Sequence, residues 1–295
     1  MATVTAVNTG VSKPIPAAWV GIIDDYLTAQ RAAGRPRTTL GTRRAHLARM
    51  ARDLKCQPGE VTDDSLLRWF GKPRAWQIET RRSYRNTLRS FFGWAHATGR
   101  LADNPASALP SVKASKPAPR PTPENVWQVA IDAADHADDR RVSIMLRLAS
   151  HGLRRGEVAQ VHVRDLTRTD RGALLLVHGK GNKLRTIPIS DELAAMVELG
   201  AASHSPWLTG EGWVFPGADG GHLSPRWVGR LCSRIMPGVW TMHSLRHRCA
   251  TRAYRATRNI RAVQRMLGHE SVATTERYTW VDDDEVRAAM MAAVA

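Results

Sequence analysis

The side chains best suited to chemistry in this sequence are arginines, a lysine, histidines and a tyrosine that together could act on a phosphate ester. In chain order, with one glutamate among them, they are Arg154, Glu157, Lys180, His243, Arg246, His247, His269 and Tyr278. An arginine stays protonated at any working pH and presents a fixed fork of donors, so two arginines can neutralise and orient a phosphodiester. Such preorganised donors are worth about 3–4 kcal/mol each in a transition state. A phenol is a poor nucleophile at its usual pKa of about 10, so nearby cations or a histidine must help to remove its proton.

Each of the four segments that carry these residues also has an ordinary explanation. The segment HGLRRGE at residues 151–157 fits a surface ion pair between Arg154 and Glu157. The segment GKGNK at residues 179–183 fits a solvated hairpin tip, and it is not a P-loop because the spacing to a final Gly-Lys-Ser/Thr is absent. The segment HSLRH at residues 243–247 places its histidines and Arg246 on one side of a helix, as a helix start with hydrogen-bonded imidazoles also would. The Leu-Gly-His at residues 267–269, nine residues before Tyr278, fits a capped helix and a core aromatic.

The order of the segments is far more specific than any one of them. Arginine, lysine, His-x-x-Arg, Leu-Gly-His and tyrosine follow one another as in the tyrosine recombinases, and the sequence resembles the lambda-type integrases and Xer-type recombinases of that family. The segments VFPG at residues 214–217, LSP at residues 223–225 and Ala250-Thr251 resemble the family too. The resemblance covers about residues 124–285 by motif, and the helical unit before them by architecture and basic charge.

The resemblance implies a role for each of these residues. By matching positions, Arg154 and Arg246 clamp the scissile phosphate, Lys180 is the hairpin lysine, and His243 and His269 are the two histidines of the site. Tyr278 is the nucleophile that forms a 3′-phosphotyrosyl bond, Glu157 buttresses the site and His247 supports it. Because that bond retains the energy of the original linkage, rejoining to a new strand requires no ATP, and the resemblance implies no metal or other cofactor. One departure is small, since His151 stands where many members have threonine.

Charge and composition agree with a nucleic-acid partner. The chain of 295 residues has a formal net charge of +16, which suits a polyanion because each lysine or arginine that meets a phosphate releases a counterion. Residues 1–123 hold 20 Lys/Arg against 8 Asp/Glu, a net of +12, and residues 124–295 hold 23 against 19, a net of +4. A basic solubilising surface or an affinity for anionic membrane would also fit, but no lipidation motif, signal peptide or membrane-spanning run supports a membrane. The odd number of cysteines, three, indicates a reduced, cytoplasmic setting, and the DNA partner places the protein at the nucleoid.

Periodicity and composition divide the chain into four parts. Residues 1–14 are predicted to be a flexible tail, residues 15–109 a helical DNA-binding domain, residues 110–123 a proline- and lysine-rich linker, and residues 124–295 a catalytic domain with a C-terminal helix. Helices are expected near residues 19–27, 39–54, 63–70, 79–98, 243–257, 260–267 and 274 onward, with another after Ser224-Pro225 and a β-hairpin over residues 173–189. A further helix at the start of the second unit is expected to bury Val126, Val129, Ala130 and Ala133. The predicted fold is therefore mainly α with a small β-sheet.

The resemblance implies how these parts meet DNA. It implies a SAM-like core-binding bundle and a mixed α/β catalytic domain that close around double-stranded DNA at core-type attachment sites. The expected phosphate contacts of the first unit are Arg43, Arg44, Arg81, Arg82 and Arg85. It also implies a homo-tetramer on DNA that is joined through the C-terminal helix. The tetramer is expected to serve a phage or other mobile element, with accessory DNA-bending or directionality proteins as further partners.

Three rival functions are weighed against recombination. A zinc enzyme could use His243, His247 and Cys249, but the chain has neither His-Glu-x-x-His nor a Cys-x-x-Cys pair. A non-catalytic DNA-binding accessory protein should have lost Arg154, Arg246 or Tyr278, and all three are present. A topoisomerase or telomere resolvase would share the chemistry, and only family analogy disfavours it.

Overall fold

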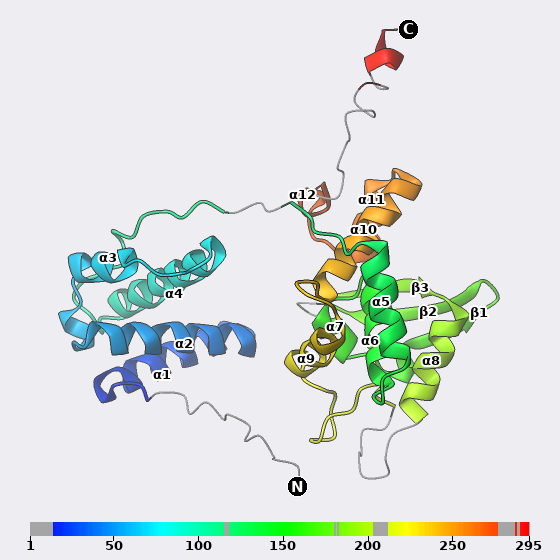
Figure 1. The fold of residues 1–295 in the computed structure, drawn as a ribbon. Helices are drawn as coiled ribbons and strands as arrows, with labels where there is room; N and C mark the ends of the chain where they lie inside the picture. Colours follow the sequence, from blue (N-terminus) through cyan, green and yellow to red (C-terminus); the bar gives the residue numbers. More distant parts are fainter. Residues whose placement is uncertain are drawn as a thin grey trace. The chain divides into compact units, whose positions relative to one another are not determined.

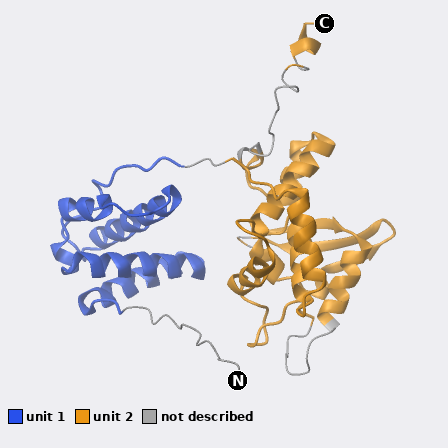
Figure 2. Ribbon diagram, viewed as in Figure 1, with its two compact units in different colours: residues 1–117 blue, residues 118–295 orange. Residues whose placement is uncertain are grey.

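The computed structural model describes residues 14–114, 118–179, 181, 183–202, 212–276, 287 and 290–294. The chain divides into two compact units, residues 1–117 and residues 118–295 (Figure 2). The boundary falls inside the segment that is rich in proline and lysine. None of the described helices is both long and apolar enough to cross a membrane.

The first unit is a bundle of helices (Figure 1), and its core is rich in aromatic side chains. Its helices are α1 (Ala17–Ala32), α2 (Arg37–Leu54), α3 (Asp63–Gly71) and α4 (Ile78–Ala97), with a 3-10 turn η1 at Pro58–Glu60. Helix α3 begins where expected, because the Thr62 hydroxyl accepts a hydrogen bond from the Ser65 amide. The largest buried side chains are aromatic, and they are Trp19, Tyr26, Trp69, Phe91 and Phe92.

The second unit combines helices with one small sheet. Its helices are α5 (Glu124–Asp135), α6 (Arg141–Ser150), α7 (Arg155–Ala159), α8 (Asp191–Ala202), α9 (Pro225–Ile235), α10 (Met242–Thr257), α11 (Ile260–Leu267) and α12 (Val272–Glu276), with a 3-10 turn η2 at Val163–Asp165. The strands β1 (Leu166–Thr169), β2 (Gly172–His178) and β3 (Leu184–Ile189) form an antiparallel sheet with β2 in the middle. The prediction of a mainly α fold with a small sheet is confirmed, and so is the β2–β3 hairpin, whereas β1 was not expected.

The core of the second unit is organised around α6, which is buried on most of its surface. It packs against α5, α7, α8, α9 and α10, while α8 also lies against β2 and α11 against β3 (Figure 1). Because α6, α7 and α10 pack together, the HGLRRGE and HSLRH segments are held close to each other. The sheet contributes its own edge to the same region through the contact of β3 with α11.

The predicted buried face of α5 was wrong by one residue. The structure buries Ala130, Ile131 and Ala134, while Val129 is 59% exposed. Both sets have helical spacing, so periodicity alone does not choose between them. The choice is made by size, because Trp127 also packs against the core and brings more apolar area than Val126 does.

The last residues of the expected linker belong structurally to the second unit. Thr122 is 3% exposed, its amide donates to the Ser244 carbonyl at 3.2 Å, and its hydroxyl donates to the Ser244 hydroxyl at 2.8 Å. Near the other end of the segment, the Arg85 guanidinium donates to the Leu109 carbonyl at 3.1 Å. Both ends of the linker are therefore fixed to folded elements.

Ser224 is expected to set the start of α9 and hence the position of its arginines. Its hydroxyl accepts from the Trp227 amide at 3.2 Å, and Pro225 occupies the first helical position. Replacing Ser224 with alanine removes this cap and should lower the free energy of unfolding by about 1 kcal/mol. Urea unfolding monitored by circular dichroism measures this loss. The matched control is Ser233→Ala, because Ser233 is exposed within the same helix and should change stability little; equal losses in both variants would contradict the capping role.

Candidate active site

Arg246 is a buried guanidinium at the centre of the site. Helix α10 begins with a capping box in which Thr241 and Ser244 bond each other's backbone amides, and this start directs His243, Arg246 and His247 to one side. The Arg246 side chain is 2% exposed and donates to the carbonyls of Gly152 and Leu267, the latter at 2.6 Å. A buried charge is tolerated only when it is well paired, so these acceptors define its position.

Arg154 lies beside Arg246 but is partly open to solvent. Its backbone is extended at the N-cap of α7, and its side chain is 37% exposed. Nη1 donates to Glu157 Oε1 at 2.7 Å and Nη2 donates to the Gly268 carbonyl at 3.2 Å. Arg154 therefore combines a fixed orientation with access to a ligand, as a phosphate-binding residue requires.

Glu157 is the carboxylate that gathers the arginines. It is 4% exposed, and it accepts from the Arg154 amide at 2.7 Å and from Arg185 Nη1 and Nη2 at 2.9 and 2.7 Å. Arg246 Nη1 lies 3.9 Å from its Oε2. Burial alone would raise the pKa of Glu157, but the hydrogen bonds from Arg185 and Arg154 outweigh it and hold the pKa below its ordinary value. Glu157 is thus ionised and buttresses the site, and the exposed ion pair that the isolated segment suggests is wrong as a description of it.

Arg185 was not predicted as a site residue. It stands on β3, is 11% exposed, and also donates from Nε to the Met266 carbonyl at 3.0 Å. The signal was present in the sequence, because Arg185 has the same strand parity as Ile187 and Ile189, which are both buried. An arginine on the buried face of a strand needs an anion, and that requirement points to an internal carboxylate.

Three successive backbone carbonyls at the end of α11 bind three different arginines. Met266 accepts from Arg185, Leu267 from Arg246 and Gly268 from Arg154. Gly268 ends the helix in the left-handed region with φ 63°, which turns these carbonyls away from the helix ladder. The carbonyl end of a helix also carries partial negative charge, so it stabilises the cations it binds.

The histidines of α10 form a short hydrogen-bonded relay. The backbone amide of Arg120 donates to His247 Nδ1 at 3.0 Å, and His247 Nε2 lies 3.0 Å from His243 Nε2. Since Nδ1 of His247 accepts, its proton is on Nε2 and is donated to His243, which then carries its own proton on Nδ1. The packing of Arg120 on α10 therefore fixes the tautomer of both imidazoles.

His269 follows the same glycine that ends α11. Its amide donates to the Gln264 carbonyl at 3.1 Å, and its Nδ1 lies 2.9 Å from the hydroxyl of Thr275. Thr275 itself is only 1% exposed. Thr275 was not predicted, and no spacing rule would have indicated it. The structure brings His269 to the Arg154 side of the site, since both line one hollow.

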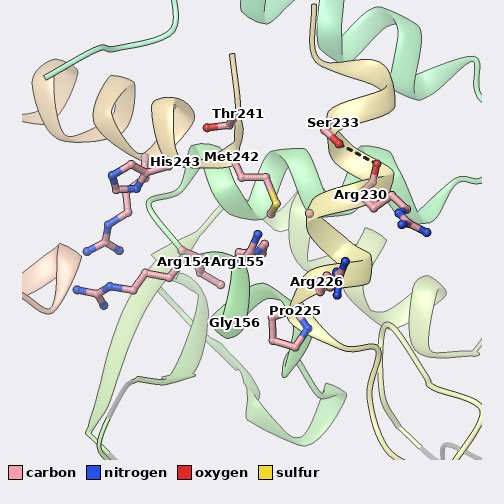
Figure 3. A pocket seen from close by; sticks show the side chains of 13 residues that line it. Arg154, Arg155, Gly156, Pro225, Arg226, Arg230, Ser233, Thr241, Met242 and His243 are labelled. Atoms are coloured by element: carbon pink, nitrogen blue, oxygen red, sulfur yellow. Dashed lines mark hydrogen bonds between the residues drawn. The ribbon is translucent and has the colours of Figure 1, made fainter. Parts of the chain in front are cut away.

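Two hollows meet at Arg154. One, of about 870 Å³, lies between α7, α9 and the start of α10, and among its lining residues are five arginines and no aspartate or glutamate. Figure 3 shows Arg154 and His243 at one end of this pocket, Arg230 and Ser233 of α9 at the other, and Arg155 between them. The second hollow, of about 1030 Å³, lies between β3 and the end of α11 and includes Lys183, paired with Glu270 at 2.7 Å. The larger share of the charge that lines both hollows is positive, which favours a phosphate backbone as occupant.

Lys180 and Tyr278 lie outside the described residues, so their predicted places in the site stay predictions. No three His, Cys, Asp or Glu side chains within the described part of the chain are grouped so that they could hold a metal ion.

The five arginines predicted to contact DNA in the first unit each have an intramolecular partner. Their acceptors are Tyr26 Oη for Arg43 at 2.7 Å, Asp24 for Arg44, the Phe70 carbonyl for Arg81 at 3.2 Å, Glu79 for Arg82 at 2.8 Å, and the Leu109 carbonyl for Arg85 at 3.1 Å. Arg44 and Arg82 are 46% and 37% exposed and form only surface ion pairs, which water and salt weaken. These two are therefore the more available of the five for phosphates.

Comparison with known proteins identifies the family of this chain. Residues 122–285 match the model of the phage integrase family. The chain is 32% identical over 212 residues to tyrosine recombinase XerC of Bradyrhizobium diazoefficiens, a match that covers 68% of this chain and 66% of that protein. It is 34% identical over 207 residues to XerC of Azotobacter vinelandii, covering 67% and 68%, and 29% identical over 284 residues to XerD of Caulobacter vibrioides, covering 90% and 92%. The chain belongs to the phage integrase family of tyrosine recombinases.

Solved structures show the same fold. The chain resembles XerH site-specific recombinase bound to its palindromic difH substrate with a TM-score of 0.69 at 17% identity, covering 88% of this chain and 81% of that one. It resembles a lambda integrase dimer bound to a COC′ core site with a TM-score of 0.66 at 21% identity, covering 90% and 77%.

Replacing Glu157 with glutamine should destabilise the second unit severely. The change leaves three arginines without their shared anion, and breaking a buried ion pair from one side costs about 3–5 kcal/mol. Because the folded pKa of Glu157 lies below its ordinary value of 4.5, its stabilisation is full above that pH and is lost as the pH falls through the folded pKa. Urea unfolding at pH 7 and at pH 3.5 should therefore show a large deficit that shrinks in acid. Glu198→Gln is the control, since Glu198 pairs with Arg168 at the surface; a deficit no larger than in this control would show that Glu157 is not the organising anion.

Proposed function

We propose that this protein is a site-specific DNA recombinase that cleaves and rejoins DNA strands through a covalent bond to Tyr278. The observation that carries the proposal is the convergence of the Arg154 and Arg246 guanidiniums, from two different elements, on the backbone carbonyls of one turn beside a basic hollow. Family membership and the names of the XerC and XerD relatives support it. The chain spans 66% of the length of the first of these relatives, so the activity is inferred from the site as well as from the family.

In this mechanism the protein first neutralises the scissile phosphate. Arg154, partly exposed, reaches the non-bridging oxygens from the mouth of the site, while Arg246 sets the positive potential from within it. The developing charge of the transition state is then met by permanent positive charge. Because the tautomers of His243 and His247 are fixed, Nδ1 of His243 is one defined proton donor of the site.

The strand exchange itself is a pair of transesterifications. The Tyr278 oxygen attacks phosphorus and loses its proton, the bond to the 5′-oxygen breaks, and Lys180 gives the leaving oxygen a proton. A 3′-phosphotyrosyl bond and a free 5′-hydroxyl result. A 5′-hydroxyl of another strand then attacks the phosphotyrosine and releases Tyr278, so the number of phosphoester bonds is conserved and no ATP is needed.

The remaining assignments are proposals of the same kind. We assign residues 15–109 as a core-type DNA-binding domain, residues 110–123 as the linker and residues 124–295 as the catalytic domain, with Arg44 and Arg82 as the leading phosphate contacts of the first domain. Assembly of four copies on two duplexes through the C-terminal helix, action on a phage or mobile element, accessory DNA-bending proteins and a cytoplasmic, nucleoid-associated location complete the proposal. XerH bound to difH and lambda integrase bound to a core site, which share this fold, support the choice of duplex DNA as partner.

A nicked suicide substrate tests the chemistry directly. Loss of the short fragment beyond the nick should trap the wild-type protein on DNA, and peptide mapping should find the DNA on Tyr278. The Tyr278→Phe variant should form no adduct, and Arg154→Ala should slow adduct formation by about 10²–10³-fold, the effect of losing one preorganised donor.

The suicide-substrate gel and a plasmid relaxation assay together separate the alternatives. Binding without any covalent product by the wild-type protein would support a non-catalytic accessory factor instead. Linkage through another residue would overturn the assignment of Tyr278. Relaxation of supercoiled plasmid without exchange between two sites would support a topoisomerase.

The arginines of α9 should contribute phosphate contacts to DNA binding. Arg226 and Arg230 are exposed, lie one turn apart and line the basic hollow. Each phosphate contact contributes about 0.9 to the slope of log K against log salt, so replacing both with alanine should reduce that slope by about 2. Fluorescence anisotropy between about 50 and 200 mM salt measures it. Arg168→Ala serves as control because Arg168 is held by Asp191 and Glu198; an unchanged slope in the double variant would exclude these contacts.

A further inference from the structure

We propose that Arg185 is a positioning residue for strand cleavage, which acts by holding both anchors of the Arg154 guanidinium. The inference rests on the proposed function and concerns a residue on β3, outside the segments that carry the recombinase motifs. Arg185 does not need to touch DNA for this role. Its side chain is 11% exposed, and Nε, Nη1 and Nη2 each donate to an internal acceptor.

The first anchor of Arg154 is Glu157. Oε1 of Glu157 accepts from Arg154 Nη1 at 2.7 Å and from Arg185 Nη1 at 2.9 Å, so the two guanidiniums share one oxygen. Arg185 Nη2 donates to the other oxygen at 2.7 Å, which completes a two-point contact. Two parallel hydrogen bonds from a planar fork fix the plane of a carboxylate, whereas one bond leaves it able to pivot. The Arg154 amide also donates to Oε2 at 2.7 Å, so Arg185 and this backbone bond together set the direction in which Oε1 faces the Arg154 side chain.

The second anchor of Arg154 is the Gly268 carbonyl. Arg185 reaches the same turn through its Nε, which donates to the Met266 carbonyl two residues earlier. Arg185 also packs directly under Gly268, since a Cβ at that glycine would lie 3.0 Å from Arg185 Cδ and 3.2 Å from its Nη1. One side chain of the sheet thus bonds both the carboxylate and the helix end that orient Arg154.

Lysine cannot replace Arg185 in this arrangement. A lysine keeps the charge, but its single ammonium cannot bond both oxygens of Glu157 in a plane and the Met266 carbonyl at once. The Arg185→Lys variant should therefore keep its counter-charge for Glu157 and lose its geometry. Small misplacements of a group that binds the reacting phosphate lower rates by up to about 10²-fold.

The experiment measures single-turnover adduct formation on the nicked substrate at saturating full-length protein. Arg185→Lys should form the adduct about 10–100-fold more slowly than the wild type, with DNA affinity within about threefold of it, because binding is spread over many phosphates. Arg168→Lys, on the opposite edge strand β1 of the same sheet and paired at the surface, is the matched control and should react at the wild-type rate.

A double-mutant cycle with Arg154→Ala distinguishes positioning from a general structural loss. If Arg185 acts through Arg154, adding Arg185→Lys to Arg154→Ala should slow the reaction by less than about threefold further. Multiplying defects, or a wild-type rate in Arg185→Lys alone, would overturn the proposal. If circular dichroism shows Arg185→Lys unfolded, Arg185→Gln replaces it in the same assay, because a glutamine amide can donate to one acceptor but cannot hold both oxygens of Glu157 and the Met266 carbonyl together. Absence of any adduct with the wild-type protein would instead reject the proposed function.

Discussion

The structure of the second unit depends on offsetting the mutual repulsion of several guanidiniums that lie close together. Arg154, Arg185 and Arg246 come from the start of α7, from β3 and from α10, and each binds the same helix end. Two of them bind Glu157 directly and the third lies 3.9 Å from it. One buried carboxylate and three backbone carbonyls therefore supply the negative charge, while the guanidinium of Arg154 stays accessible. A bound group with further negative charge would neutralise the remaining positive charge of the cluster. The same cluster of arginines that is costly to bury on folding is therefore suited to bind a phosphate.

This constraint explains why the fold needs a small sheet within a mostly helical unit. A helix could present Arg154 or Arg246, but Arg185 must approach Glu157 and the α11 end from a third direction. The strand β3 provides it, because its alternation places Arg185 inward together with Ile187 and Ile189. The packing of α6 against α7 and α10 keeps Arg154 and Arg246 close to each other through contacts in the core. The contacts that build the core therefore also set the geometry of the site.

The sequence reveals the parts of the site that are linked to short motifs and local periods. The HGLRRGE and HSLRH segments, the β2–β3 hairpin and the start of α9 at Ser224 were all predictable, because each depends on residues within one or two turns of each other. What was missed depends on contacts far along the chain. Arg185 is 28 residues from Glu157 and 81 from Met266, and no local rule connects them. The buried face of α5 was misplaced for a related reason, since two sets of helical spacing compete and only tertiary packing of Trp127 decides between them.

The histidine relay extends the same logic to the backbone that enters the second unit. A linker that only joined two domains would make no contact with site residues. Here the Arg120 amide donates to His247 and so determines which ring nitrogen of His247 carries the proton. The buried contact of Thr122 with Ser244 holds that amide against the first turn of α10. Displacing residues 120–122 would allow His247 to place its proton on Nδ1, and His243 would then lose the donor that fixes its own tautomer. The proton positions in the site are therefore set partly by the chain that joins the two units, and not by the motif residues alone.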